Sequence, residues 1–201
     1  MRKKRGTILI ALGLLLLLGA AGLTLYNIHV EAQAGESANE ISGELATVLA
    51  DVEQKPPVKS APPDYLEETE EQTIELDGRY YLGLITFPTI NLQLPVQHEW
   101  SYENLRISPC RMTGDILSEN LVVLAHNYRT HFGPLLNNVG VGDEVSLMLV
   151  DGSVYVYKVA AKEVVAPTAV ENVTGGDWPL TLFTCTLGGR TRMVLRCDWA
   201  E

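Results

Sequence analysis

At 201 residues, the chain is long enough for one domain of ordinary size with attachments. Its formal net charge of −10 at pH 7 argues against nucleic acid as a partner. The charge is uneven, because residues 31–77 carry 13 acidic side chains against Lys55 and Lys59, whereas residues 78–201 carry 12 acidic and 9 basic ones. The acidity therefore belongs to a connecting segment and not to the domain that follows it.

The N-terminus combines a basic cluster, Arg2-Lys3-Lys4-Arg5, with an uncharged, leucine-rich run from Thr7 to Tyr26. Twenty helical residues at about 1.5 Å each span roughly 30 Å, the thickness of the hydrocarbon core of a bilayer. Basic residues before the run and none directly after it place the N-terminus inside. We therefore expect residues 1–28 to form a cytoplasmic basic tip and a single-pass transmembrane signal-anchor in the cell membrane, with the rest of the chain extracytoplasmic.

A cleaved secretory signal is the alternative for this N-terminus, because Ala32-Gln33-Ala34 has the small-x-small pattern of a cleavage site. The apolar core of such a signal is roughly 7–15 residues long, so the longer run here favours an uncleaved anchor. Both alternatives export the rest of the chain.

Residues 29–77 are predicted to form an acidic, proline-containing extracellular stalk. Its first part, from Glu31 to about Val52, is rich in Glu and Ala and has a short apolar stripe at helical spacing. That stripe consists of Ile41, Leu45, Val48 and Leu49. Pro56-Pro57 and Pro62-Pro63 then prevent a continuous helix and indicate a linker. The Glu-rich segment Tyr65–Thr73 is expected to form a short helix at the domain edge.

Residues 78–201 are predicted to form one mainly β domain. Apolar or alternating runs indicate strands at Tyr80–Phe87, Leu92–Val96, Leu121–Ala125, Glu144–Val150, Ser153–Val159, Leu180–Thr186 and Thr191–Trp199. Seven or eight short strands in about 120 residues indicate a closed barrel, which removes exposed sheet edges. Short helical turns are expected at Ser101–Arg106, with Ser101 as N-cap, at Phe132–Val139 and at Thr168–Asn172.

Asp151-Gly152 is a strong signal for a two-residue hairpin turn between two of these strands. Period-2 alternation from that turn puts Leu147 and Leu149 on the same face as Val154 and Val156. We therefore expect these four side chains to share a core.

Three strand ends carry side chains that together suit nucleophilic catalysis. Cys185 lies near the end of one apolar run, His126 directly follows another, and Arg192 lies at the start of the last. A thiolate, an imidazole and a fixed cation can attack a carbonyl and stabilise the oxyanion that results. Taken alone, Cys185 would be an ordinary core thiol, the commonest state of a cysteine in an apolar strand.

Two of these positions have a neighbouring competitor. His131 lies five residues after His126, but His126 directly follows a strand that fixes its backbone. Arg196 shares a strand face with Arg192 by period-2 alternation. We take His126 as the acid–base candidate, whereas these grounds alone leave open whether Arg192 or Arg196 holds the carbonyl oxygen.

Thr181-Leu182-Phe183-Thr184-Cys185 resembles the TLxTC signature of the sortases, the cysteine transpeptidases of Gram-positive cell surfaces. Further segments resemble the first strands, the histidine region and the arginine strand of that family: Tyr81–Pro88, Leu92–Val96, Ala125–Asn127, His131–Leu135 and Arg192–Leu195. The resemblance covers residues 80–199 and implies a sortase-like closed eight-stranded β-barrel with short helices. Trp100–Leu105, Ser108–Arg111 and Ala125–Tyr128 look most like class B-type sortases, with Ala125 where sortases usually carry glycine.

The resemblance implies that Cys185 cleaves a C-terminal, LPxTG-like sorting signal between Thr and Gly through a thioacyl-enzyme. The surface protein would then pass to an amine of a peptidoglycan precursor. The resemblance also suggests a place beside the oxyanion for Thr184, and Asn127 could orient His126, as in other Cys-His-Asn enzymes. No cofactor is implied, and a metal site is not expected because no two-cysteine metal spacing is present.

Three alternatives stay open for the function. A pilin-type or specialised-substrate sortase would use another substrate or another acceptor amine, and a cysteine peptidase would use the same Cys–His pair with water. A non-catalytic surface-binding β-domain would keep Cys185 as a structural residue only.

Cys110 and Cys197 remain as an even pair once Cys185 is assigned as the nucleophile. In an oxidising exterior they could form a disulfide, or both could be buried thiols. Because free cysteine is commonly buried, we favour two buried thiols.

Overall fold

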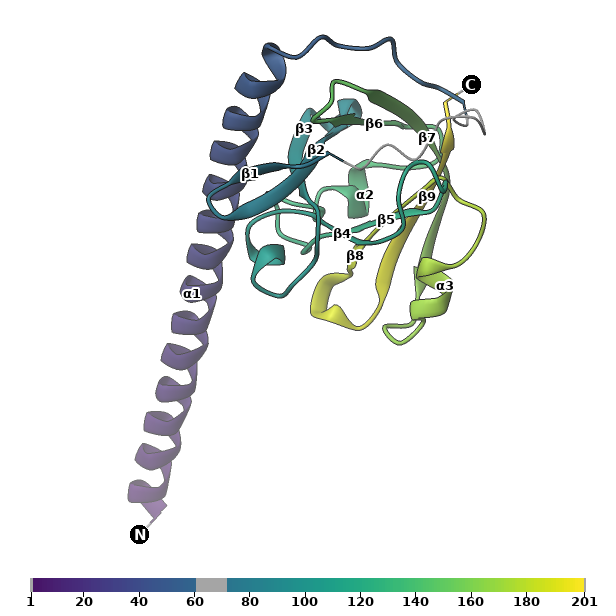
Figure 1. Cartoon of the computed structure of the whole chain (residues 1–201). Helices are drawn as coiled ribbons and strands as arrows, with labels where there is room; N and C mark the ends of the chain where they lie inside the picture. Colours follow the sequence, from purple (N-terminus) through teal and green to yellow (C-terminus); the bar gives the residue numbers. More distant parts are fainter. Residues whose placement is uncertain (1, 61–71, 201) are drawn as a thin grey trace. The chain divides into compact units, whose positions relative to one another are not determined.

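The computed structural model of the protein describes residues 2–60 and 72–200, with side chains from residue 6 onward (Figure 1). The side chains of the N-terminal basic cluster, Pro62-Pro63 and most of the helix expected at Tyr65–Thr73 lie outside the described residues. The chain forms two units, of which the first ends at Gln33 and the second begins at Ala34.

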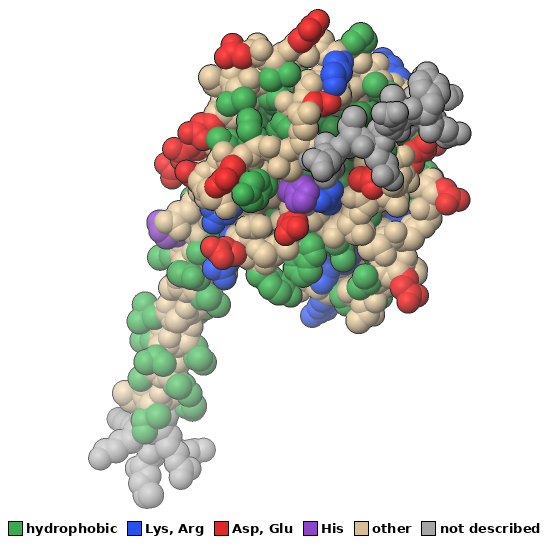
Figure 2. All heavy atoms as spheres, in the orientation of Figure 1, with side chains coloured by type: hydrophobic (Ala, Val, Ile, Leu, Met, Phe, Trp, Pro, Cys, Tyr) green, Lys and Arg blue, Asp and Glu red, His purple; other side chains and the backbone are tan. Residues whose placement is uncertain are grey.

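Helix α1 runs from Arg2 to Ala50. Its first part is rich in leucine and alanine, which are strong helix formers, and no proline occurs before Pro56. An 18-residue window within Gly6–Ala50 has a mean hydropathy of 2.6 and none of it is buried. Figure 2 shows the hydrophobic side chains that cover this stretch. By length and composition the helix is therefore a candidate membrane span, as the sequence predicts.

The last part of α1 belongs to the same unit as the barrel, although the sequence predicts a stalk here and a domain that begins at residue 78. One helix face is buried at every third or fourth residue, which is the spacing of a docked amphipathic helix. The buried apolar side chains are Ala34, Ala38, Ile41, Leu45 and Leu49, and Gly35 and Ser42 are buried as well. The docked stripe is longer than the one expected, because two alanines extend it, while Val48 is 38 % exposed and lies outside it.

Eight strands close into a barrel, which confirms the predicted fold class (Figure 1). They are β2 (Arg79–Phe87), β3 (Leu92–Gln97), β4 (Cys110–Thr113), β5 (Leu121–Leu124), β6 (Glu144–Leu149), β7 (Val154–Val165), β8 (Leu180–Cys185) and β9 (Arg192–Trp199). Neighbours follow the order β2-β3-β4-β5-β8-β9-β7-β6, and β6 pairs with β2 to close the ring. A short further strand, β1 (Ile74–Leu76), pairs with the start of β2.

The interior of the barrel holds the main hydrophobic core. Phe87 and Phe132 meet there edge to face, with ring centroids 5.7 Å apart. The pairing of β2 with β6 closes the barrel and includes Gly83. An added Cβ at this residue would lie 1.8 Å from the carbonyl oxygen of Met148. Only glycine allows the two backbones to approach so closely, so the closure of the barrel depends on this residue.

Short helices and 3-10 turns connect the strands. They are η1 (Pro88–Ile90), η2 (Asn104–Arg106), α2 (Leu135–Asn138), α3 (Val170–Thr174) and η3 (Leu187–Gly189). The N-cap of η2 is Glu103 and not Ser101 as predicted, although the Oγ of Ser101 accepts a hydrogen bond from the backbone N–H of Asn104 at 2.9 Å. Helix α3 begins two residues later than the turn expected at Thr168–Asn172.

The hairpin between β6 and β7 differs from the prediction in its register. Four residues separate the two strands, so the loop is longer than Asp151-Gly152 alone. Leu147 therefore lies opposite Tyr155 and shares the barrel core with it, whereas Val154 and Val156 are not part of that core. The cause is the two-residue period of a strand, in which a shift of one residue moves every side chain to the other face.

Candidate active site

The three residues that the sequence singles out lie at one edge of the barrel, on three neighbouring strands. Strands β5 and β8 are parallel, with Leu124 beside Phe183, so His126 and Cys185 both lie two residues further on. The backbone N–H of Ala125 extends this pairing with a 3.3 Å hydrogen bond to the carbonyl oxygen of Phe183. Strand β9 is antiparallel to β8 and places Arg192 directly across from Cys185.

The three cysteines differ in access to solvent. Cys185 is half-buried, whereas Cys110 and Cys197 are buried, and all three are free thiols. The expectation of two buried thiols is therefore confirmed. Burial raises the pKa of Cys110 to about 12 and raises that of Cys197 as well, so both stay protonated and unreactive.

His126 is half-buried beside the cysteine, and its ring stacks on that of Tyr128 with centroids 4.7 Å apart. Its pKa is lowered, first by burial and second by the positive charge of Arg106. Both effects favour the neutral imidazole, which can accept a proton from a neighbouring thiol.

The competing histidine, His131, is fully buried. Burial and the nearby His126 lower its pKa to about 4, while the backbone at Ile107 and Ala34 acts in the opposite direction. One ring nitrogen, Nε2, lies 3.1 Å from the carbonyl oxygen of Ile107. A fully buried ring has no access to a substrate, so the geometry favours His126 for catalysis.

The two arginines of β9 have different surroundings. Arg192 is half-buried, and its Nη1 donates to the carbonyl oxygens of Gly189 at 3.0 Å and Thr191 at 3.1 Å. Among the described residues, its Nε and Nη2 donate no hydrogen bond. Arg196 is only 4 % exposed, and its guanidinium is occupied by oxygen atoms of the α3 region. The geometry therefore favours Arg192 as the residue open to a substrate.

Thr184 and Asn127 connect the strand ends that carry the cysteine and the histidine. The buried hydroxyl of Thr184 donates to the carbonyl oxygen of Ala125 at 2.8 Å. The side-chain amide of Asn127 donates to the carbonyl oxygen of Thr186 at 3.3 Å. Both bonds fix the end of β5 against the end of β8, so the amide of Asn127 is directed to the backbone.

Sequence reasoning gave no role to the contact between α1 and the loop that follows His126. An added Cβ on Gly35 would lie 2.4 Å from Cγ2 of Thr130 in that loop. The small residues Ala34, Gly35 and Ala38 are the signal that could have indicated this contact, because they let a helix approach another backbone closely.

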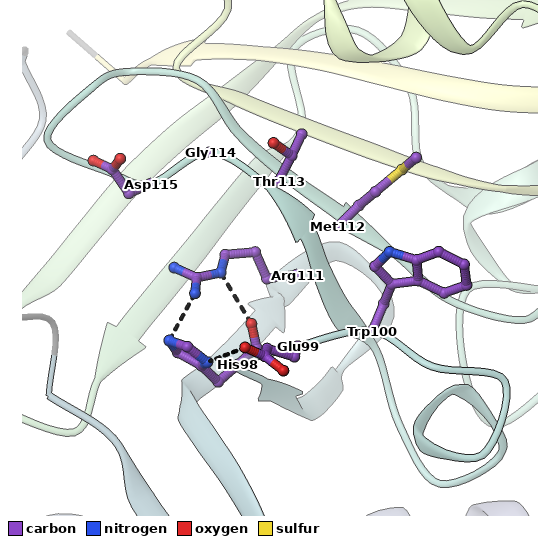
Figure 3. Close-up of a pocket in the computed structure, with 8 residues that line it drawn as sticks. All are labelled: His98, Glu99, Trp100, Arg111, Met112, Thr113, Gly114 and Asp115. Atoms are coloured by element: carbon purple, nitrogen blue, oxygen red, sulfur yellow. Dashed lines mark hydrogen bonds and ion pairs between the residues drawn. The ribbon is translucent and has the colours of Figure 1, made fainter.

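A separate polar pocket of about 530 Å³ lies along β4 and the segment after β3 (Figure 3). Arg111 crosses it, with its Nε 2.9 Å from the carbonyl oxygen of His98 and its Nη2 2.6 Å from the Nε2 of that histidine. Trp100 stands at the other end of the pocket as Figure 3 draws it. Neither Cys185 nor Arg192 lines this pocket.

The described part of the chain contains no group of three or more His, Cys, Asp or Glu side chains that could hold a metal ion. On the face seen in Figure 2, acidic side chains are scattered and do not form a single cluster.

The sortase domain family model matches residues 85–200, which is more than half of the chain. A search of curated proteins finds no match.

Several solved structures share this fold. Sortase C1 of Streptococcus agalactiae is 24% identical, over 68% of this chain and 79% of that chain, with a TM-score of 0.53. Clostridium perfringens sortase C with the C-terminal cell wall sorting motif is 23% identical, over 85% and 89% of the two chains, with a TM-score of 0.53. Sortase A of Listeria monocytogenes is 23% identical, over 60% and 88%, with a TM-score of 0.52.

Proposed function

The chain belongs to the sortase family, and we propose that it is a cysteine transpeptidase with Cys185 as its nucleophile. The observation that carries this proposal is the pairing of Cys185 with Arg192 at the edge where β5 ends and His126 follows. Of the three cysteines, Cys185 alone is partly exposed, and a nucleophile has to reach its substrate.

The reaction begins with a proton transfer from the thiol of Cys185 to His126, and the thiolate then attacks the carbonyl carbon of the sorting-signal threonine. A C–S bond forms while the carbonyl electrons move to oxygen. Collapse of this intermediate breaks the C–N bond between Thr and Gly, and His126 gives its proton to the departing glycine amine. The lowered pKa of His126 supports the first step, which needs a neutral imidazole.

The second half of the reaction uses an amine as the acceptor. The amine attacks the thioester, a new C–N bond forms, and the C–S bond breaks to release the Cys185 thiolate. His126 accepts the proton that the amine loses. The product is the surface protein joined through a new amide bond.

Arg192 stabilises the negative charge on the carbonyl oxygen in both halves. Two loop carbonyls hold its Nη1, which orients the guanidinium at the edge next to Cys185. We assign supporting roles to Thr184 and Asn127, whose hydrogen bonds keep the ends of β5 and β8 in register.

The proposed partners are surface proteins with a C-terminal, LPxTG-like sorting signal and an amine of a peptidoglycan precursor. The match to the Clostridium perfringens enzyme, whose structure includes a sorting motif, supports the first of these. A pilin-type acceptor is the second candidate, because one similar structure is a sortase C1 of a pilus island. The matched structures include sortases C and A, so the class B-type resemblance stays a prediction.

The proposed location is the cell membrane, with the N-terminus inside and the catalytic unit on the extracytoplasmic side. The apolar stretch of α1 supports a single-pass anchor. The basic cluster before that stretch supports the orientation.

Intact-mass spectrometry tests the proposal on the full chain in detergent. The protein is mixed with a panel of sorting-signal peptides, with and without an amine acceptor such as triglycine. We expect a peptide adduct that maps to Cys185 and that the amine discharges into a new amide product. Cys185→Ala should abolish both and leave the melting temperature almost unchanged, because the side chain is small and half-buried.

Each other outcome selects an alternative. Hydrolysed peptide without an amine product indicates a cysteine peptidase. Peptide binding without an adduct, at the same affinity in Cys185→Ala, indicates a non-catalytic binding domain and contradicts the proposal.

A further inference from the structure

The docked part of α1 changes character along its length. Toward its C-terminal end, Ile41, Leu45 and Leu49 pack with Tyr81 and Leu84 in a cluster of their own. Toward its N-terminal end the buried side chains are small, and Ala38 joins the main barrel core. Large side chains thus attach the helix to the barrel, while small ones bring its backbone close to another segment.

That other segment is the loop that follows His126. A Cβ on Gly35 would lie 2.4 Å from Cγ2 and 2.8 Å from Cβ of Thr130. The next residue, His131, is fully buried, and the backbone at Ala34 is among the groups that act on its ring. The helix therefore forms one wall of the space that Thr130 and His131 occupy.

A continuous set of contacts leads from these residues to His126. Tyr128 lies between the two histidine rings, with centroid distances of 5.3 Å to His131 and 4.7 Å to His126. The loop is also closed by backbone hydrogen bonds, because Phe132 donates to the carbonyl oxygen of His126 at 3.1 Å and His131 to that of Tyr128 at 3.0 Å. These contacts connect Thr130 and His131 to His126 through Tyr128 and the loop backbone.

We propose that the Ala34–Ala38 turn of α1 is a positioning element for the catalytic histidine, acting through Thr130, His131 and Tyr128. The helix that continues from the apolar N-terminal stretch is then part of the catalytic apparatus. The proposal rests on the function proposed above, because it assigns His126 the acid–base role. It goes beyond that function by making turnover depend on a residue that touches no substrate.

Gly35→Ala is the most direct test, in the full chain reconstituted in detergent or nanodiscs. The added methyl group requires a shift of about 1 Å to reach an ordinary contact distance, and a displacement of that size near a catalytic group costs roughly 10- to 100-fold in rate. We expect kcat to fall about tenfold or more with KM within twofold of the wild type. The second readout is the His126 ring titration by NMR with labelled histidine, assigned with His126→Gln, and its midpoint should move in Gly35→Ala.

Gly43→Ala is the matched control, because Gly43 lies on the same helix and a Cβ there meets nothing within 4 Å. It makes the same chemical change and should leave kcat and the His126 titration unaltered. Thr130→Gly removes both the Cγ2 and the Cβ atoms that the new methyl group would meet, so it should restore part of the activity of Gly35→Ala. Circular dichroism and melting curves show which variants are folded.

The proposal is overturned if Gly35→Ala matches Gly43→Ala in both kcat and the His126 titration, or if Thr130→Gly restores nothing. If Gly35→Ala fails to fold, Thr130→Gly alone decides, because the looser loop should still alter the His126 titration. If the wild type forms no thioacyl adduct, the proposed function fails, whereas the NMR titration still reports on the positioning of His126.

Discussion

At two paired positions, or rungs, of the antiparallel strands β8 and β9, an arginine lies opposite a short polar side chain. The two arginines differ in their hydrogen bonding and in their exposure to solvent. Arg196 lies across from Thr181 in the interior of the ladder, and Arg192 lies across from Cys185 at its end. Both arginines come from the same strand. The difference between them is the number of oxygen atoms that surround each guanidinium.

At the interior rung, oxygen atoms hold both Nη1 and Nη2 of the guanidinium, while its Nε lies 3.9 Å from Oε1 of Glu163. Arg196 donates to the carbonyl oxygens of Val173 at 2.9 Å, Gly175 at 3.4 Å and Asn172, and to Oγ1 of Thr181 at 3.2 Å. These oxygens belong largely to the C-terminal end of α3, where unpaired helix carbonyls attract a cation. Arg196 therefore has a structural role, because its hydrogen bonds hold the end of α3 against the barrel.

At the terminal rung the chain leaves the barrel in a glycine-containing turn. Two loop carbonyls accept from a single nitrogen of Arg192, which leaves the rest of the guanidinium for a ligand. Two arginines of one strand thus differ because the fold surrounds one guanidinium with hydrogen-bond acceptors and leaves most of the other open to a ligand.

Arg196→Ala should lower the free energy of unfolding by about 3–5 kcal/mol, because it leaves several buried oxygens of α3 unpaired. Urea denaturation followed by circular dichroism measures the loss. Arg190→Ala, at an exposed position of the neighbouring turn, is the control and should change stability by less than about 0.5 kcal/mol. Equal stability of the two variants would contradict the structural role assigned to Arg196.

Arg192→Ala should reduce kcat/KM by roughly 10²–10³-fold, the usual cost of losing one oxyanion donor. Its stability should change by no more than about 1 kcal/mol, since the half-buried side chain bonds only to loop carbonyls. Arg192→Lys should restore the charge but only part of the rate, because an ammonium lacks the planar fork of donors. A stability loss as large as that of Arg196→Ala would contradict a reactive role.

The two histidines of the loop that follows β5 also differ, and their difference predicts a dependence of stability on pH. His131 titrates near 6.5 when unfolded and at about 4 when folded, so the unfolded state binds more protons between these values. Stability should therefore be fully present above pH 6.5 and fall by about 3 kcal/mol as the pH drops to about 4. Denaturation curves at pH 7 and pH 4.5 measure the slope, which His131→Gln should flatten.

Arg106→Gln should produce the smallest effect. The positive charge of Arg106 is the second cause of the lowered pKa of His126, after burial, and the residue is exposed to solvent. Removing it should raise the His126 pKa, and less so at high salt. NMR titration of the ring detects the shift, and a shift downward would show that Arg106 does not act through its charge.

Local patterns were sufficient for seven of the eight barrel strands and for the edge where the site lies, whereas the four-residue strand β4 was not predicted. Strand ends at Ala125 and Cys185 follow from short apolar runs, and the Gly-Gly turn fixes Arg192 close to Cys185 in sequence. The choice between Arg192 and Arg196 is explained by acceptors on α3, more than 20 residues away along the chain. No pattern within one strand carries that information.

Long-range contacts account for what sequence reasoning missed. The docking of α1 depends on a loop almost 100 residues further along the chain, so the small residues Ala34 and Ala38 indicate a close approach without identifying the segment that they contact. The β6–β7 register was wrong because the turn signal of Asp151-Gly152 does not state the length of its loop.

The parallel pairing of β5 with β8 also has a consequence for biosynthesis. Hydrogen bonds that align the two catalytic strand ends join residues 59 positions apart, with β6 and β7 between them in the chain. Contacts of such high sequence separation form late in folding, after the intervening loop has been ordered. A nascent chain therefore carries its histidine long before its thiol, and the two meet only in a nearly finished barrel. Under the proposed function, an incompletely folded chain therefore lacks the paired thiol and imidazole that the reaction needs.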